Sequence, residues 1–438
     1  MNFFVGAAAA VSYLLFFMAY QYVRPKKVLS VMDMFFFMFS LQFGPHSIFL
    51  HPYLEDRGFA SSVYPQYATG LTLAFCGLAT GLFAAGALAK TRSVQLYPFR
   101  GADLTLKRSF VILGVAAAYL VLFVAYQGFD LSRTLNYLNF FRGNSLYTYT
   151  ELRRELYEGD AGLSLAAVTR QTSSAIIFSA LVYSGIKFRT WRLVFFGMAA
   201  LLFIICCLQM NKFPFLYYTL LASLVVFAHR AYRTGVFINK SIAFKVAITG
   251  GSLVGLLTAL YWIQYRNEIE AGIVTSDRIL FRIISRPFAG NHGSLYYWFD
   301  VFPQKHDFVG LANVPAVARI FGMEPFAPTI AVPSYYLDAN TTFQAGYIGG
   351  AYASFGYAGI WVYSLFVGGW VSLLTAYEGK IDVLWQRIAF FSVVGLNMYF
   401  LSSRELHTAM QSGGFVLAPL MIFAVRNLPR TLRTGTLK

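Results

Sequence analysis

The stretch "SDRILFRIISRPFAGNHGSLYYWFD", residues 276–300, decides how the rest of this chain is interpreted. Three arginines, Arg278, Arg282 and Arg286, recur at every fourth position, a spacing that places them along one side of a short helix. Isoleucine, leucine and phenylalanine occupy the other sides, and the proline and glycine that follow are expected to end the helix. Because only 12% of the chain is charged, three aligned guanidinium groups indicate a surface that binds an anion.

The composition of the whole chain indicates a protein that crosses a membrane many times. Its 438 residues are 57% hydrophobic, and the charged fraction is half of the roughly 25% typical of soluble domains. We therefore predict an all-α polytopic membrane protein, with residues 1–438 forming one integral membrane domain. A bilayer-spanning helix needs about 20 apolar residues. About eleven runs approach that length, near 3–23, 28–50, 67–89, 109–127, 164–185, 193–209, 214–228, 246–264, 346–377, 388–402 and 415–427.

The distribution of charge along the chain predicts how these spans are oriented. If the N-terminus lies outside, the inner segments hold most of the lysines and arginines, with only Asp103, Glu378 and Asp382 as acids. Cytoplasmic segments of membrane proteins carry such an excess of positive charge, so we predict an outer N-terminus and a cytoplasmic C-terminus. The net charge of +16 then reflects topology and contact with anionic lipid. Nucleic-acid binding is excluded, because it would need a soluble basic module with stacking aromatic residues.

Two outer loops, 128–163 and 265–345, are long and rich in arginine and aromatic residues. Long loops in compact proteins are usually functional. A guanidinium group binds phosphate through two parallel hydrogen bonds and keeps its charge at any relevant pH. In the first loop the alternative is that arginines pair with neighbouring acids. The predicted diphosphate-binding residues are Arg278, Arg282, Arg286, Arg142, Arg153, Arg154, Arg170 and Arg319.

Aromatic residues of the second loop are candidates for binding sugars, because flat rings stack on the apolar faces of sugar rings. The alternative is that tyrosine and tryptophan simply collect at the membrane interface. The candidates are Tyr296, Tyr297, Trp298, Tyr335 and Tyr336.

Three side chains on the predicted outer side are candidates for catalysis: Asp338, Glu405 and His292. Transfer to a hydroxyl acceptor needs a base within hydrogen-bonding reach of that hydroxyl. The alternative for each residue is a capping or paired role. The chain has no HExxH, Cys-His cluster, Gly-x-Ser-x-Gly or phosphate-binding loop motif. We therefore predict neither a metal site nor a bound cofactor.

An ordered set of motifs resembles the Wzy-type O-antigen polymerases of Gram-negative bacteria, especially those of Pseudomonas. That family has two large periplasmic loops, each with an arginine and a glycine separated by ten residues. Arg282 and Gly293 have this spacing, whereas Arg153 and Gly162 in the first loop are separated by eight. The chain also contains the family-like turn "KFPF" at 212–215. A glycine-rich span follows an asparagine-containing entry in "LDANTTFQAGYIGGAYASFGYAGI" at 337–360.

This resemblance implies a GT-C-type glycosyltransferase of the bacterial inner membrane, active on the periplasmic face, in which Gly293 has a structural role. Such an enzyme moves a growing glycan from undecaprenyl diphosphate to the non-reducing end of an undecaprenyl-diphosphate-linked repeat unit. The implied partners are a Wzz-type chain-length regulator and, upstream, a Wzx-type flippase. Two alternatives stay open: an O-antigen ligase, for which His292 is the argument, and a lipid-linked oligosaccharide flippase or transporter.

Overall fold

The structure analysed is a computed structural model, and the described part of the chain is helical. It comprises residues 2–25, 29–49, 60–91, 103–127, 172–207, 212–235, 293–336 and 343–427, with positions 251, 255, 258, 259 and 262. Within these residues there are α-helices and short 3₁₀ turns but no strand, which confirms the all-α prediction. Four helical segments of the described residues are long and apolar enough to cross a membrane: α1 (Asn2–Val23), α5 (Ala60–Leu88), Arg189–Cys206, which contains most of α11 (Arg192–Cys207), and α18 (Gly346–Gly379).

Other predicted spans coincide with further described helices. These are α6 (Leu106–Gln127), α10 (Ser173–Lys187), α12 (Lys212–Thr234), α19 (Leu384–Ser403) and α21 (Leu417–Asn427). The predicted span at 246–264 lies outside the described residues except for single positions. The predicted span at 28–50 is two helices, α2 (Val31–Phe43) and α3 (Pro45–Phe49). The chain changes direction between them because Pro45 has no N–H to continue α2, and it instead takes the first position of α3.

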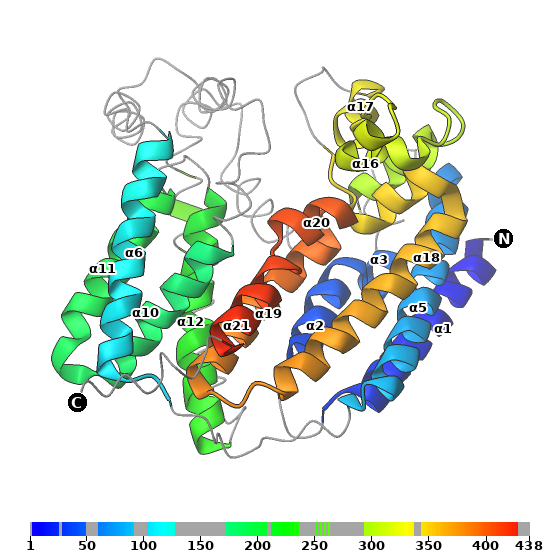
Figure 1. Cartoon of the computed structure of the whole chain (residues 1–438). Coiled ribbons are helices and arrows are strands. Elements are labelled where there is room, and N and C mark those ends of the chain that lie inside the picture. Colours follow the sequence, from blue (N-terminus) through cyan, green and yellow to red (C-terminus); the bar gives the residue numbers. More distant parts are fainter. Residues whose placement is uncertain are drawn as a thin grey trace. The chain divides into compact units, whose positions relative to one another are not determined.

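The chain divides into two compact units. The first unit contains residues 1–96, 284–380 and 397–413, and the second contains residues 97–283, 381–396 and 414–438. In the second unit α10 packs on α6, α11 and α12 (Figure 1). At one end of that group, Asp103 accepts hydrogen bonds from the Tyr183 hydroxyl at 2.7 Å and from the Lys187 ammonium group at 2.6 Å. This contact joins the entry of α6 to the end of α10.

The first unit is built on α1, α5 and α18, which lie side by side (Figure 1). Helices α5 and α18 approach closely because small residues face each other. A methyl group added at Gly81 would lie 2.1 Å from the Leu365 carbonyl oxygen, and one added at Gly368 would lie 2.5 Å from that of Leu78. Such close backbone approach is typical of helices packed in membranes, where small residues line the contact.

Helix α18 is interrupted within its length. Phe355 and Gly356 have non-helical backbone angles, and Gly356 has a φ of +62°, which glycine adopts without steric cost. Beside this break, the Val309 N–H donates to the Ala353 carbonyl oxygen at 2.9 Å. The segment that follows Val309 forms the turn η3 (Gly310–Asn313) and the helices α16 (Pro315–Ile320) and α17 (Pro328–Ser334). The first half of α18 is thereby joined to these short elements.

Candidate functional site

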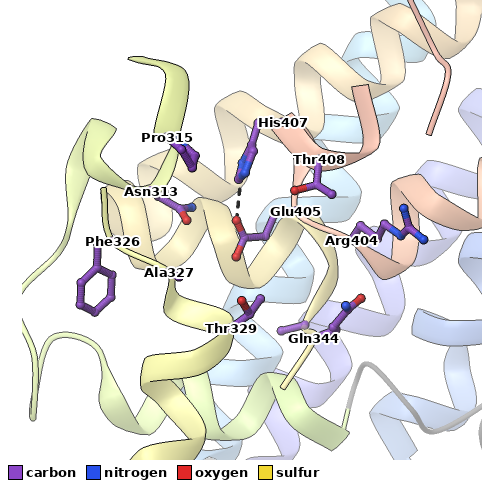
Figure 2. A pocket seen from close by; sticks show the side chains of 11 residues that line it. Asn313, Pro315, Phe326, Ala327, Thr329, Gln344, Arg404, Glu405, His407 and Thr408 are labelled. Carbon is purple, nitrogen blue, oxygen red and sulfur yellow. Dashed lines mark ion pairs between the residues drawn. The ribbon is translucent and has the colours of Figure 1, made fainter. Parts of the chain in front are cut away.

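The first unit contains a cavity of about 230 Å³ between the residues that precede α18, the start of α20 (Leu406–Ser412) and the segment from η3 to α17 (Figure 2). Its polar lining includes Asn313, Thr329, Gln344, Glu405 and His407. A second cavity of about 240 Å³ shares Asn313, Glu405 and His407 with the first. These three side chains are therefore the common wall of both cavities.

Glu405 is placed by the turn between two helices. Helix α19 ends at Ser403, and Glu405 takes the N-cap position of α20, where its carbonyl oxygen accepts the Ala409 N–H at 2.9 Å. The Asn397 side-chain amide donates to the Gly413 carbonyl oxygen at 2.7 Å, and this bond ties the end of α20 back to α19. The carboxylate is consequently held on a short, braced element and is only 9% exposed.

The backbone of Gly350 on α18 lies directly against the side chains of Glu405 and Asn313. A Cβ atom added at Gly350 would lie 3.1 Å from Glu405 Cγ and 3.4 Å from Asn313 Nδ2. Glycines four residues apart on a membrane helix, such as Gly346 and Gly350, usually serve close packing between helices. The structure places Gly346 against the Ser402 carbonyl oxygen but places Gly350 against two polar side chains of the cavity.

Burial controls the charge of the Glu405 carboxyl. Removal from water disfavours its ionised form and raises its pKa to about 7. Burial also lowers the pKa of His407, whose Nδ1 lies 3.5 Å from Glu405 Oε2. Near pH 7 the imidazole is therefore mainly neutral, and this long contact is weaker than an ion pair. A carboxyl group with a pKa near the working pH is well suited to exchange a proton with a substrate.

Asn313 is a site residue that sequence reasoning did not select. It is 3% exposed, and its Nδ2 donates to the Gly350 carbonyl oxygen at 3.2 Å and to Ser354 Oγ at 3.1 Å. The signal in the sequence was an amide beside the Val314-Pro315 pair in an otherwise apolar stretch, which gave no indication that it meets Glu405.

Arg404 also lines the first of the two cavities. Its guanidinium carbon lies 4.0 Å from the centre of the Phe400 ring, which permits a cation–π interaction. Figure 2 shows the side chain directed away from the Glu405 carboxylate. Positive charge therefore sits at one edge of the cavity.

Many of the predicted site residues lie outside the described part of the chain. They are Asp338, His292, Arg278, Arg282, Arg286, Arg142, Arg153, Arg154 and Arg170. Of the predicted arginines, Arg319 is described, and it is exposed at the end of α16. Gly293 begins a helix over residues 293–301.

The predicted sugar-binding aromatic residues fall into two groups. Tyr296 and Trp298 are fully buried, and the Tyr296 ring stacks on Tyr67 with centres 4.3 Å apart. Tyr297, Tyr335 and Tyr336 are more accessible. The Tyr336 hydroxyl donates to the Asp300 carboxylate, and burial raises the pKa of Tyr336 above its usual value. None of the five lines either of the two cavities described here.

None of the family models, curated proteins or solved structures compared with this chain matches it. A buried carboxyl, a neutral imidazole and a fixed amide around a small polar cavity can accept a proton from a hydroxyl group and hold that hydroxyl in place.

The Gly350→Ala variant tests whether activity depends on the close contact of Gly350 with Glu405 and Asn313. Its methyl group would press on Glu405 and Asn313, whose displacement by a few tenths of an ångström is expected to reduce the predicted transfer activity roughly tenfold. Protein abundance and thermal stability should change little, because alanine favours a helix more than glycine does. Gly369→Ala is the matched control on the same helix, since its methyl group would lie 3.8 Å from the nearest atom, Ala85 Cβ. Equal activity in both variants would contradict the arrangement.

Proposed function

We propose that this chain is a glycosyltransferase that polymerises lipid-linked oligosaccharide repeat units, an O-antigen polymerase of the Wzy type. In this proposal it has about eleven spans of GT-C architecture in the bacterial inner membrane, with the N-terminus periplasmic and the C-terminus cytoplasmic. The observation that supports it best is Glu405, a buried carboxyl with a pKa of about 7 on the wall of a polar cavity. The resemblance of the ordered motifs supplies the substrate class.

The proposed reaction exchanges one bond for another at the first sugar of the donor glycan. The bond between the anomeric carbon and the diphosphate oxygen breaks, and a bond from that carbon to the acceptor hydroxyl oxygen forms. The hydroxyl proton passes to the Glu405 carboxylate, and undecaprenyl diphosphate leaves with the electron pair. Diphosphate is a good leaving group when cations hold its charge, so a single carboxylate is sufficient as base.

The predicted arginine stripe at Arg278, Arg282 and Arg286 has the role of holding that diphosphate. Arg404 adds positive charge at the edge of the cavity. Both substrates are amphiphiles, so they reach this site from the outer leaflet. A Wzz-type chain-length regulator and a Wzx-type flippase are the expected functional partners.

Purified protein in lipid vesicles, given undecaprenyl-diphosphate-linked repeat units extracted from cells that carry this gene, tests the proposal. We expect a ladder of lengthened, lipid-linked glycans on gels stained for carbohydrate. Glycan that extends only onto added lipid A core would indicate a ligase. Repeat units that cross the vesicle membrane but never lengthen would indicate a transporter, and either result would overturn the proposed polymerase.

A further inference from the structure

We infer that the cavity beside Glu405 receives the acceptor as a single sugar ring carrying two neighbouring hydroxyl groups, and that Asn313 is the positioning residue that selects them. This inference rests on the proposed function and assigns the cavity to the acceptor rather than to the donor diphosphate. It also names a residue that no motif of the sequence indicated.

The orientation of the Asn313 amide is fixed by its own hydrogen bonds. Both hydrogens of its Nδ2 are used, one by the Gly350 carbonyl oxygen and one by Ser354 Oγ. The Gly350 carbonyl can only accept, so the reverse orientation of the amide would place two acceptors together. Oδ1 is therefore turned away from α18, and in the described part of the chain this buried oxygen has no hydrogen-bonding partner.

The Asn313 amide and the Glu405 carboxyl face the same small space. Asn313 Nδ2 and Glu405 Cγ both lie within 3.4 Å of the point where a Gly350 Cβ would stand. Figure 2 shows the two side chains around one opening, with the His407 ring beside them. When Glu405 is ionised, both groups can only accept hydrogen bonds, so neither can satisfy the other.

Two adjacent acceptors require a ligand that presents two adjacent donors. Neighbouring hydroxyl groups of a sugar ring meet this requirement while staying neutral. A diphosphate, which only accepts at these atoms, would be repelled. A cation is disfavoured, because Arg404 also lines the cavity. The volume of about 230 Å³ is below the roughly 300 Å³ at which pockets begin to hold drug-sized ligands, so a single ring is the expected occupant.

The two acceptors have different roles because only one of them can take a proton. The hydroxyl at Glu405 loses its proton and forms the new bond, whereas the hydroxyl at the neutral amide oxygen of Asn313 is only held. Asn313 thereby determines which of two neighbouring hydroxyl groups reacts. The position of the linkage on the acceptor ring follows from this placement.

The test uses the vesicle-bound full chain, extracted lipid-linked donor, and synthetic lipid-linked acceptors in which single hydroxyl groups of the terminal sugar are replaced by hydrogen. In the wild-type protein, removal of the reacting hydroxyl should abolish transfer. Removal of its neighbour should reduce kcat/KM for the acceptor roughly tenfold, the expected loss for one hydrogen bond to a buried partner. Asn313→Ala should raise the KM for the unmodified acceptor and leave the pH profile of the rate unchanged. In this variant, removal of the neighbouring hydroxyl group from the acceptor should cause no further loss of kcat/KM.

Ser354→Ala provides a second variant if Asn313→Ala does not accumulate. It removes one of the two hydrogen bonds that fix the Asn313 amide. The loss of kcat/KM caused by removing the neighbouring hydroxyl group from the acceptor should therefore be smaller than in the wild-type protein. The inference is overturned if either variant polymerises normally and keeps the full wild-type penalty. Absence of polymer from the wild-type protein with any acceptor would instead contradict the proposed function, so the two failures are distinguishable.

Discussion

Glu405→Gln is expected to reduce the rate of polymer formation by about two to four orders of magnitude, the usual contribution of a general base. The amide has nearly the same shape as the carboxyl, so the cavity should keep its form and the acceptor KM should change little. The measurement is kcat for chain lengthening in vesicles. Glu324→Gln is the matched control, because Glu324 is exposed in the segment from η3 to α17 and does not line either described cavity.

The pH dependence of the wild-type rate provides a second readout of the same residue. A base acts in its ionised form, so the rate should rise with pH, pass its midpoint near the Glu405 pKa of about 7, and level off above it. The activity that remains in Glu405→Gln should not rise with pH in this range. If the rate of the variant rose with pH as the wild-type rate does, the group that titrates near pH 7 would be a residue other than Glu405.

Glu405→Gln should also stabilise the fold above neutral pH. The pKa of Glu405 is raised from a usual value of 4.5 to about 7, so the folded state binds this proton more tightly than the unfolded state. The favourable contribution is complete below pH 4.5 and is lost as the pH rises through 7. Glutamine does not ionise, so at pH 8 the variant should be more stable by on the order of 3 kcal/mol. A higher Tm at pH 8, with no difference at pH 4, would show this.

Arg282→Ala is expected to abolish polymer or shorten it severely, while protein abundance stays normal. Its guanidinium group is predicted to stabilise the charge that develops on the departing diphosphate, an interaction worth several kcal/mol in an enclosed site. Arg282→Lys should restore only part of the activity, because ammonium cannot form two parallel hydrogen bonds. Polymer length on carbohydrate-stained gels is the measurement.

The control for Arg282→Ala is the substitution of an arginine that lies outside the predicted diphosphate-binding residues. Arg189 is exposed in the turn η2 (Arg189–Trp191), on the predicted cytoplasmic side, so Arg189→Ala should leave polymer length unchanged. Full activity of Arg282→Ala would remove that residue from diphosphate binding without affecting the role of Glu405. The two catalytic components are therefore tested separately.

The sequence was sufficient to predict the all-α fold and one residue of the described cavity. Apolar runs of bilayer length identify helices directly, because the bilayer leaves few alternatives for the backbone. Glu405 was identifiable as a carboxylate in a short turn between two predicted spans. The break at Gly356 was not identifiable, because a glycine in a glycine-rich span has no distinguishing pattern.

Asn313 could not be predicted for a different reason. Its role depends on hydrogen bonds to Gly350 and Ser354, more than 35 residues away along the chain. The burial that raises the Glu405 pKa is likewise a property of packing. Tyr296 and Trp298 are buried, although they were predicted to bind sugars. A run of aromatic residues has the same sequence pattern whether it lines a cavity or packs in a core.

The interruption of α18 has a consequence for how such a protein can diversify. Before the break, α18 bonds through Gly350, Ala353 and Ser354 to the segment from Val309 to Asn313, whereas after it Gly368 packs on α5. A rigid continuous rod would transmit every adjustment at one end to the other. The break instead separates the half of α18 that bonds to the segment from Val309 to Asn313 from the half that packs on α5, so substitutions near Gly350 can change the cavity with little effect on the contact between α18 and α5.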